Sequence, residues 1–446
     1  MRQLCLFSLI LTGLLTGPYS SRAQVSGDPN QTQSGVLIRP SLFGLSANSG
    51  IVSQQPWPED SFGSLRLLGA GTAWSDMNPG PGKYDFDILT GFLQGAKDHG
   101  QTILLVFEQT PKWASSRPND TSCTGPAGSC DPPNDLNADG TGSNQHWKDF
   151  VTAVVNLSVS FGPGHIRHYE LWNEPYHEWY WTGTYAQLIR MAADAYTIIK
   201  SIDPTAKVAS PSFAWEIKTG VDWMGGYFDA GGGQYADQID VHGYVFNRNA
   251  ATGWPENVAK YATDFHNSLR QYGQQGKPVW NSEANWGKDI PGRRYFDDPD
   301  LQAAWLARMY LMLPSYGVNY FYWFSWNDPG VAPLWEPDPN DPSQPGTLLK
   351  PGVAYQQVYN WMVGATLTQA CTPQGTVWSC VFQRSGGYVA EAIWDASLSC
   401  DHGQCKTENH TVNAMFKQYR KLNGDTAKIV GNTVPVGAKP IWLENQ

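Results

Sequence analysis

The chain has 446 residues, of which 41% are hydrophobic and 16% are charged. This composition excludes a disordered or low-complexity protein and predicts a large globular protein with two domains. The 30 basic and 40 acidic residues give a formal net charge of −10, which disfavours nucleic acid and anionic lipid as partners. Aromatic residues make up 13% of the chain, and its 20 tryptophans favour a surface that stacks on sugar rings.

The first 23 residues have the pattern of a secretory signal peptide. Arg2 precedes an apolar run from Leu4 to Leu15, and the small residues around Ala23 offer a cleavage site. We therefore predict cleavage after Ala23, export to the extracellular space or the periplasm, and a flexible leader over residues 24–40. No later apolar run reaches the roughly 18 residues that a membrane span needs, so we expect no membrane partner.

Six cysteines follow the predicted cleavage site, and they fall into three local pairs. The pairs are Cys123 with Cys130, Cys371 with Cys380, and Cys400 with Cys405. Export favours disulfide bonds, and closeness in sequence favours this connectivity among the alternatives. A zinc site is the other interpretation, but the sequence has no CxxC motif.

Residues 41–364 alternate between strand and helix patterns. Eight β-branched or aromatic runs are predicted strands: Leu42–Ser46, Ser64–Gly69, Thr102–Glu108, Ile166–Trp172, Lys207–Ser210, Ile239–Tyr244, Pro278–Glu283 and Val318–Trp326. Six segments with apolar residues at spacings of three and four are predicted helices: Asp87–His99, His146–Phe161, Thr184–Ile202, Val258–Tyr272, Asp300–Tyr316 and Val353–Val363. This alternation indicates an α/β fold, the (β/α)8 or TIM barrel. A doubly wound sheet is the alternative, although no GxGxxG follows the first strand.

The pattern changes after Gly364. Short alternating stretches such as Val377–Gln383, Tyr388–Trp394 and Lys428–Val430 are interrupted by turn residues, which predicts a small all-β sandwich domain over residues 365–446. Such a small domain buries little apolar surface, so we expect its disulfides and its contact with the barrel to stabilise it. The proline-rich segment Asp328–Pro351 is predicted to be a long loop over the barrel mouth.

Two predicted strands end in a glutamate. The fourth strand leads into Asn173, Glu174 and Pro175, where the proline ends strand pairing, and the seventh ends at Glu283. The active site of a (β/α)8 barrel lies at the carboxyl ends of its strands, so both glutamates are candidate catalytic residues. Capping of a following helix is the alternative for each glutamate taken alone.

These motifs resemble clan A of the glycoside hydrolases and are most similar to family 39 and its unclassified relatives. The resemblance rests on Trp172 to Pro175, Glu283, Arg66 in the second strand, and His242 to Tyr244 after the sixth. The opening Phe43-Gly44, segments 74–86 and 110–114, and the C-terminal β domain extend it over nearly the whole mature chain.

The resemblance implies a retaining glycosidase in which Glu174 is the acid and then the base, and Glu283 is the nucleophile. Their carboxyl groups are then expected to lie roughly 5 to 5.5 Å apart. Ionised Glu283 would raise the pKa of Glu174, while Arg66 and Tyr244 would keep Glu283 ionised. Asn173 is expected to hydrogen-bond the sugar 2-hydroxyl.

Further residues are expected to line the cleft. His242 is one of them, with a buried structural histidine as the alternative interpretation. Trp323 and Trp326 end the eighth strand and point to different faces by alternation; Trp326 is the preferred sugar platform. Trp74 and the cluster Tyr176–Trp181 are expected to flank the cleft and to select the glycan.

One segment resembles a metal loop. Asp135 to Gly140 matches the first half of a calcium loop, but position twelve is His146, where a glutamate is needed. We therefore expect a solvated loop, with no bound metal and no cofactor.

The sequence thus predicts a secreted retaining β-glycosidase whose partner is a poly- or oligosaccharide. A transglycosylase with the same residues and a non-catalytic carbohydrate-binding barrel are the alternatives. The sugar, the linkage and the oligomeric state stay open at this point.

Overall fold

The structure is a computed structural model that describes residues 32–446 except 60, 163, 246–253, 287–297 and 402. The predicted signal peptide and residues 24–31 of the predicted leader therefore lie outside the described residues. Within the described part of the chain, no helix combines the length and the apolar character that crossing a bilayer requires.

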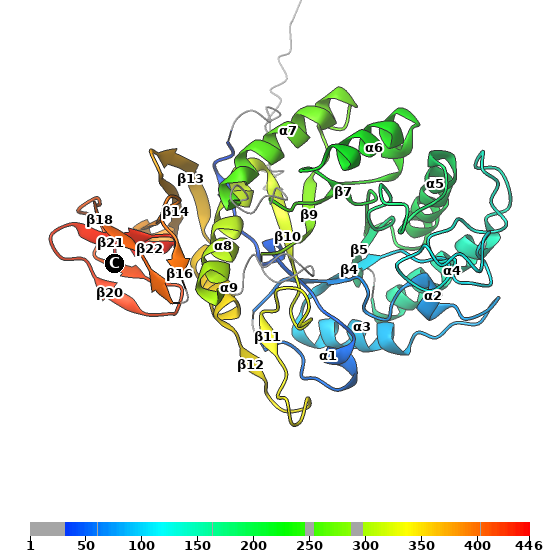
Figure 1. Cartoon of the computed structure of the whole chain (residues 1–446), viewed down its shortest axis with the longest axis horizontal. Helices are drawn as coiled ribbons and strands as arrows, with labels where there is room; N and C mark the ends of the chain where they lie inside the picture. Colours follow the sequence, from blue (N-terminus) through cyan, green and yellow to red (C-terminus); the bar gives the residue numbers. More distant parts are fainter. Residues whose placement is uncertain (1–31, 60, 163, 246–253, 287–297, 402) are drawn as a thin grey trace, which may run out of the picture.

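The first part of the described chain forms a parallel barrel (Figure 1). Around it the strands run in the order β6 (Lys207–Ala209), β5 (Ile166–Glu170), β4 (Thr102–Val106), β3 (Ser64–Leu67), β2 (Phe43–Ser46), β10 (Val318–Phe324), β9 (Val279–Ala284), β8 (Ile239–His242) and β7 (Phe213–Ala214). A parallel bridge between Ala209 of β6 and Gln238, the residue before β8, closes the barrel. The eight predicted strands are confirmed, and the closure excludes a doubly wound sheet.

Helices surround the barrel (Figure 1). They are α1 (Gly50–Ser53), α2 (Trp74–Met77), α3 (Asp87–His99), α4 (Gln145–Phe161), α5 (Tyr185–Ile202), α6 (Lys218–Asp229), α7 (Val258–Gln271), α8 (Pro299–Met312) and α9 (Lys350–Met362). The six predicted helices are confirmed with small shifts at their ends, whereas the short helices α1 and α2 and the longer α6 were not predicted.

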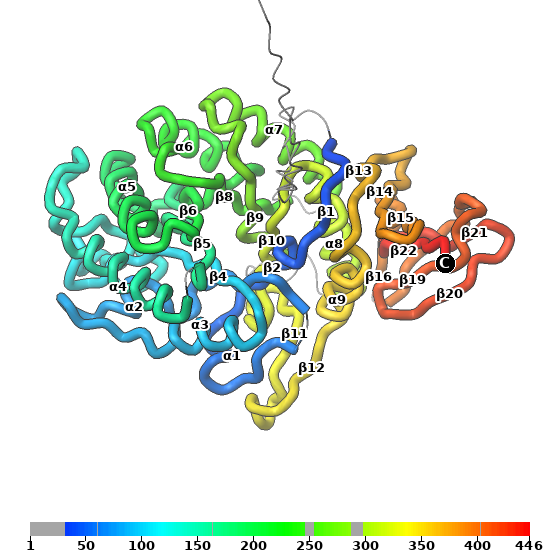
Figure 2. Tube along the Cα trace, turned by 180° about the vertical axis from the view of Figure 1, so that it is seen from behind, coloured from blue at the N-terminus to red at the C-terminus, as the bar shows by residue number. Residues whose placement is uncertain are grey.

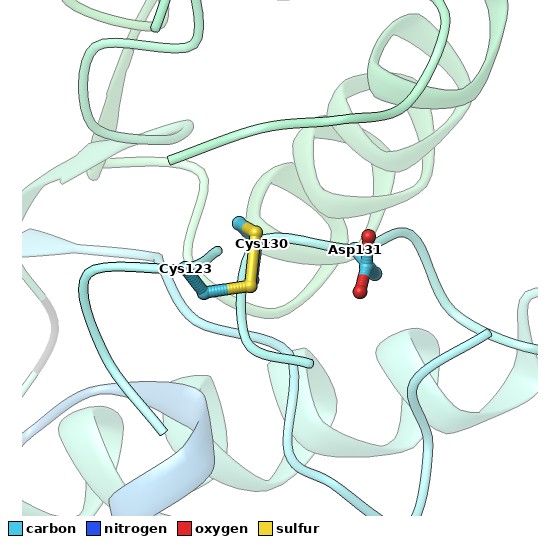
Figure 3. A group of neighbouring side chains, drawn as sticks. All are labelled: Cys123, Cys130 and Asp131. Carbon is cyan, nitrogen blue, oxygen red and sulfur yellow. A yellow bond between two sulfur atoms is a disulfide. The ribbon is translucent and has the colours of Figure 1, made fainter. Parts of the chain in front are cut away.

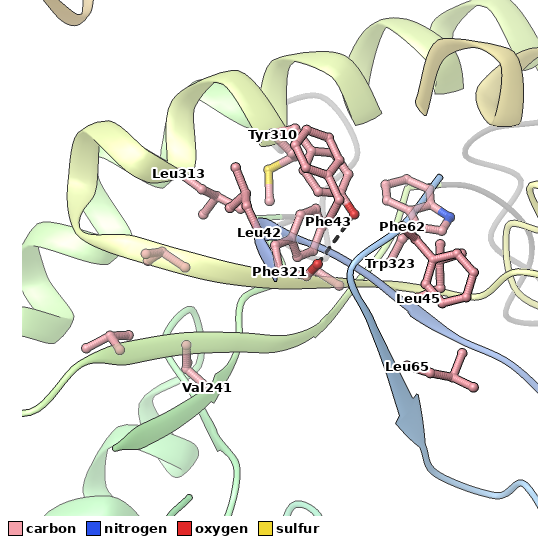
Figure 4. Close-up of a cluster of buried hydrophobic side chains, with 14 of the residues drawn as sticks. Leu42, Phe43, Leu45, Phe62, Leu65, Val241, Tyr310, Leu313, Phe321 and Trp323 are labelled. Carbon is pink, nitrogen blue, oxygen red and sulfur yellow. Dashed lines mark hydrogen bonds between the residues drawn. The ribbon is translucent and has the colours of Figure 1, made fainter. Parts of the chain in front are cut away.

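Strand residues alternate between the helices and the barrel interior. Phe43 of β2 stacks on Tyr310 of α8 with ring centroids 4.5 Å apart, and Phe321 and Trp323 of β10 belong to the same buried cluster (Figure 4). Tyr322, between them, belongs instead to a small cluster with Leu104 and Trp280. Because neighbours on a strand face opposite ways, the even-numbered residues of β10 point into the barrel.

The C-terminal domain is built on an antiparallel sheet of order β1-β13-β14-β15-β22-β19-β20. Its strands are β13 (Thr366–Gln374), β14 (Val377–Arg384), β15 (Tyr388–Asp395), β19 (Gln418–Arg420), β20 (Thr426–Lys428) and β22 (Ile441–Glu444), joined by β1 (Val36–Leu37). A second layer, β18 (Thr407–Thr411) with β21 (Thr433–Gly437), contributes to a separate apolar core with residues such as Ile393 and Leu443. The described residues of the C-terminal domain therefore form a sandwich with one large and one small layer.

The predicted flexible leader is wrong for its last residues. Val36 and Leu37 form β1, which pairs with Leu367 and Thr366 of β13, so the start of the described chain is an edge strand of the C-terminal domain (Figure 2). Backbone hydrogen bonds of a sheet hold these residues in place because the edge of β13 supplies their partners.

The barrel and the C-terminal domain share buried contacts. Trp361 of α9 stacks on Trp442 of β22 at 5.7 Å, and the indole of Trp394 donates a 2.7 Å hydrogen bond to Glu256, next to α7. Arg384 donates to the carbonyl groups of Asn360 and other residues at the end of α9. These contacts support the expectation that the barrel stabilises the small domain.

All three predicted disulfides are present: Cys123–Cys130, Cys371–Cys380 and Cys400–Cys405. The first closes a loop after β4 and lies beside Asp131 (Figure 3). The Asp131 carboxylate accepts hydrogen bonds from Arg117 and from Thr182, which follows Glu174 in the chain. The disulfide loop is therefore attached to the segment that carries Glu174.

The segment predicted to be a long loop contains a short hairpin. Its strands are β11 (Trp335–Glu336) and β12 (Thr347–Leu348), and Figure 1 shows them beside α1 at the edge of the barrel. Trp335 stacks on Trp326 with ring centroids 6.0 Å apart.

Candidate active site

A fully buried arginine organises the carboxyl ends of the strands. Arg66 of β3 donates from Nε and Nη2 to the two oxygens of Glu170, at 2.9 and 3.0 Å. Its Nη1 donates to Glu283 Oε2 at 2.8 Å, and its Nη2 lies 3.0 Å from Asn173 Oδ1. Burial alone would lower the pKa of Arg66. The charges of Glu170 and Glu283 outweigh burial and raise this pKa above its usual value, so the guanidinium stays charged.

Glu283 is held on both carboxylate oxygens. Arg66 donates to Oε2, and the Tyr244 hydroxyl donates to Oε1 at 2.7 Å. The Glu283 side chain is 10% exposed, and its residue belongs to β9, whose whole length is buried. The donors are on rigid strands or directly after them, so this carboxylate is oriented without any ligand present.

Glu174 is held differently, on one oxygen only. Its Oε1 accepts hydrogen bonds from the Tyr176 hydroxyl at 2.6 Å and from His242 Nδ1 at 2.7 Å. The Ser212 hydroxyl accepts its backbone N–H at 3.0 Å. Glu174 has a backbone φ of 40° and Trp172 one of 112°, values that cost conformational energy in residues other than glycine. The strand end therefore turns sharply to aim Glu174 at the barrel axis.

His242 joins the two glutamates. One carboxylate oxygen of each glutamate and a ring nitrogen of His242 all lie within 4.8 Å of one another. Burial lowers the pKa of His242, but Glu283 and Glu174 raise it to about 9 against the opposing charge of Arg66. Burial raises the pKa of Glu174, but the charge and hydrogen bond of His242, with Tyr176, lower it to about 2. Between about pH 2 and about pH 9, Glu174 and His242 therefore hold one titratable proton between them.

This pairing corrects one expectation. The sequence predicted that ionised Glu283 raises the pKa of Glu174, yet the structure brings an imidazole closer to Glu174 and lowers that pKa. The signal was available, because His242 follows a strand that lies between Glu174 and Glu283 in the barrel order. Its ring could be expected to touch both carboxylates.

These three residues do not suit a metal ion despite their ligand types. Arg66 donates to Glu283, and its Nη2 lies 3.0 Å from His242 Nε2. His242 Nδ1 is within hydrogen-bond distance of Glu174. Arg66 thus occupies the side of Glu283 Oε2 and of His242 Nε2 that a metal ion would need. The three residues are engaged with one another and with Arg66.

Three more carboxyl groups lie near the network. Glu108 follows β4, and burial, as the largest cause, raises its pKa to about 7. Glu216 follows β7, and burial raises its pKa to about 8, with Glu174 adding to the effect. Asp240 of β8 is fully buried, which raises its pKa. The cleft floor thus carries many more acidic than basic groups.

Two of the tryptophans that were predicted to line the cleft are buried in the barrel core. Trp74 is 0% exposed and packs between Trp147 and Phe150, so its placement at the cleft is wrong. Trp323 is also 0% exposed, and its indole donates to the carbonyl of Ala332. Both side chains belong to the barrel core.

The preferred platform, Trp326, is wrong as well, because it is only 3% exposed and stacks on Trp335. Phe324 is instead the partly exposed aromatic at the end of β10. It has the inward parity of Tyr320 and Tyr322 and therefore points to the barrel mouth. Counting alternation from the buried Tyr322 would have identified it.

Sequence reasoning also missed Glu170 as the partner of Arg66. It stands on β5 with the same parity as His168, so both face the barrel interior. A buried carboxylate needs a compensating charge, and Arg66 of β3 supplies it across β4.

The segment that resembles a calcium loop uses its oxygens otherwise. Asp135 Oδ2 accepts hydrogen bonds from the Ser143 hydroxyl and from the backbone N–H of Gln145 at the start of α4. Asp139 accepts from the backbone N–H and hydroxyl of Thr141. These bonds support the interpretation as a hydrogen-bonded loop.

Solved structures share this fold. A family 39 glycoside hydrolase from Bacteroides cellulosilyticus WH2 has a TM-score of 0.59 at 17% identity, over 92% of this chain and 82% of that one. A β-xylosidase from Caulobacter crescentus CB15 has a TM-score of 0.64 at 15% identity, over 93% and 97%. The catalytic domain of the family 30 xylanase C from Talaromyces cellulolyticus has a TM-score of 0.57 at 13% identity, over 93% and 97%.

The comparisons confirm the resemblance at the level of the fold, since structures of families 39 and 30 share the barrel and its β domain. No protein-family model and no curated protein sequence matches the chain.

Proposed function

We propose that the protein is a secreted retaining β-glycosidase that cleaves a neutral poly- or oligosaccharide. The observation that carries the proposal is the pair Glu174 and Glu283, whose nearest carboxylate oxygens lie within 4.8 Å at the carboxyl ends of barrel strands. Retaining enzymes hold their two carboxyl groups roughly 5 to 5.5 Å apart, whereas inverting enzymes need a wider gap for a water.

In the first step, Glu283 attacks the anomeric carbon while the bond to the leaving oxygen breaks. Arg66 and Tyr244 orient Glu283 for this attack, because both donate to its carboxylate. Glu174 gives a proton to the leaving oxygen, and a covalent glycosyl ester on Glu283 results. In the second step, Glu174 takes a proton from water, whose oxygen attacks the same carbon and releases Glu283. Two inversions give net retention.

The proton for the first step is held by the Glu174–His242 pair. In the free protein it resides on His242, since the pKa of His242 is about 9 and that of Glu174 about 2. A bound sugar excludes water and buries Glu174 further, and burial is the effect that raises the pKa of Glu174. The proton can then pass along the 2.7 Å hydrogen bond from Nδ1 to Oε1.

The engagement of Arg66 favours a neutral substrate. Its guanidinium already forms ion pairs with Glu170 and Glu283, so it is not available to bind a uronate. The formal net charge of −10 likewise disfavours an anionic substrate. Two compared structures are named as a β-xylosidase and a xylanase, so β-xylosides are the first substrates to test. Export is supported by three disulfides and by the signal pattern of residues 1–23.

A mechanism-based label tests this function. A 2-deoxy-2-fluoro β-xyloside with a dinitrophenyl leaving group, or the corresponding glucoside, should inactivate the protein, because fluorine slows both steps and the leaving group rescues only the first. Mass spectrometry should place the label on Glu283. The control Glu283→Gln nearly matches the carboxylate in volume and should fold but take no label.

A label on another carboxylate, or inverted product from a natural glycan, would overturn the roles of Glu174 and Glu283. Product analysis with an added acceptor sugar distinguishes hydrolysis from transglycosylation by the same two residues. Full binding of glycans without any turnover would instead favour a non-catalytic barrel.

A further inference from the structure

A small cavity beside the catalytic residues has not been used by the mechanism. Its lining includes Glu108, Gln109, Asn173, Trp179 and Tyr180. The centre of a water molecule can move within about 10 Å³ of this cavity. The cavity therefore has room for a single water or hydroxyl group but not for a sugar ring. Asn173 also contacts Arg66, so the cavity adjoins the network that holds Glu283.

The walls of this cavity are fixed in place. Gln109 has a backbone φ of 61°, and its side-chain oxygen accepts a 3.0 Å hydrogen bond from Ser75. Gly125 of the disulfide loop approaches so closely that a Cβ there would lie 2.8 Å from the Gln109 side chain. The carbonyl of Trp179 accepts two hydrogen bonds from Thr124 of the same loop. The cavity is therefore preformed.

Glu108 supplies the titratable group of this cavity. It is 4% exposed, and its Oε1 accepts the backbone N–H of Gly69 at 3.2 Å. Burial raises its pKa to about 7, and Glu170 and Asp76 add to this, while the Gly69 N–H and Arg66 oppose it. Below that pH the group is a carboxylic acid, which can both donate and accept a hydrogen bond.

We propose that Glu108 binds one hydroxyl group of the sugar ring being cleaved, with that hydroxyl seated in the cavity between Glu108 and Asn173. This inference rests on the proposed function. A sugar hydroxyl donates and accepts, as the water in such a cavity would, so it can replace that water without losing hydrogen bonds. A bulkier substituent at the same ring position, such as an acetamido group, does not fit.

Monodeoxy substrates test the contact. Of the 4-nitrophenyl β-glycosides of xylose, glucose, galactose and mannose, the one with the highest kcat/KM is compared with its monodeoxy analogues. For one ring position, removal of the hydroxyl should lower kcat/KM of the wild type roughly 10- to 100-fold, because the buried acid loses its partner. Glu108→Ala should show little further loss for that analogue. Equal losses in both proteins at every position would overturn the inference.

The pH profile separates a substrate contact from a structural role. In the wild type, KM should rise as pH increases through about 7, since Glu108 then ionises and stops donating. Glu108→Gln stays neutral, so its KM should be flat with pH through this range. Glu216→Gln is the matched control, because it also removes a buried carboxyl near Glu174 and should leave the KM profile as in the wild type.

An unchanged rise of KM in Glu108→Gln would contradict the proposal.

The experiments distinguish a failure of the proposed glycosidase function from a failure of the proposed contact of Glu108. Absence of any glycoside turnover or of any label on Glu283 overturns the proposed function and this inference with it. Turnover with a label on Glu283, but without an effect of Glu108, overturns this inference alone.

Discussion

The two sides of the cleft hold their glutamates by different means. On one side, Glu283 lies on a buried strand and receives a separate donor on each oxygen, Arg66 and Tyr244. On the other side, Glu174 lies on a turn with positive φ and receives both donors, Tyr176 and His242, on a single oxygen. Its second oxygen, Oε2, lies 4.0 Å from His177 Nε2.

This difference matches the needs of the two chemical roles that we propose for Glu174 and Glu283. A nucleophile benefits from a fixed orientation and a permanent cation, because it must stay ionised until it attacks. An acid and base needs an oxygen that can gain and lose a proton, and a neighbour with which to exchange it. Arg66 cannot release a proton, whereas His242 can. Each glutamate is therefore paired with the kind of cation that suits its role.

The largest expected effect on kcat comes from removing the Glu174 carboxyl group. Glu174→Ala should lower kcat roughly 10²- to 10⁴-fold on substrates with poor leaving groups, because their oxygen needs a proton as the bond breaks. Aryl glycosides with dinitrophenolate leaving groups need no proton, so their first step should be much less affected. Steady-state and burst kinetics on both substrate types measure the difference. Similar losses on both would remove Glu174 from the acid role.

A smaller effect is expected from the shared proton. In the wild type, kcat/KM should fall as pH rises through about 9, where the Glu174–His242 pair loses its titratable proton. His242→Gln removes the cation, so the pKa of Glu174 should rise from about 2 under the effect of burial. The proton is then held by Glu174 alone, and we expect the alkaline limb to move to lower pH by about one unit or more. An unmoved limb would contradict the sharing.

The smallest effects sharpen the comparison through two matched tyrosines. Tyr244→Phe removes a donor from Glu283 and Tyr176→Phe one from Glu174. The first should lower kcat about tenfold, since one hydrogen bond to a charged group contributes about 1.5 kcal/mol or more. The second should change kcat only about threefold, because it also raises the pKa of Glu174 and eases protonation. The reverse order would exchange the roles of the two glutamates.

The barrel could be predicted from the sequence because its strands are short apolar runs between amphipathic helices. Helix α6 could not, since Gly220, Gly225 and Gly226 lower its helix propensity. The structure supplies the reason: a Cβ on Gly225 would clash with the Tyr272 hydroxyl, and one on Gly226 would lie 2.6 Å from that of Tyr185. Close contact with neighbouring helices selects glycine there against local preference.

The clustering of the candidate catalytic residues could be predicted from the sequence, whereas the burial of the surrounding aromatic residues could not. Arg66, Asn173, Glu174, His242, Tyr244 and Glu283 come together in the structure, because strand ends in a barrel meet at one mouth. Side-chain direction depends on strand parity, which a single misplaced residue reverses. Trp323 and Phe324 are neighbours, and the parity of β10 decides which one faces the barrel interior.

The pairing of β1 with β13 has a consequence for how the protein is made. Val36 and Leu37 are synthesised before the barrel, but their partner strand follows the barrel in the chain. β1 therefore stays unpaired until β13 has been synthesised. A chain cut after Gly364 would leave β1 without its partner strand. We therefore expect a yield of native enzyme only from the full-length chain.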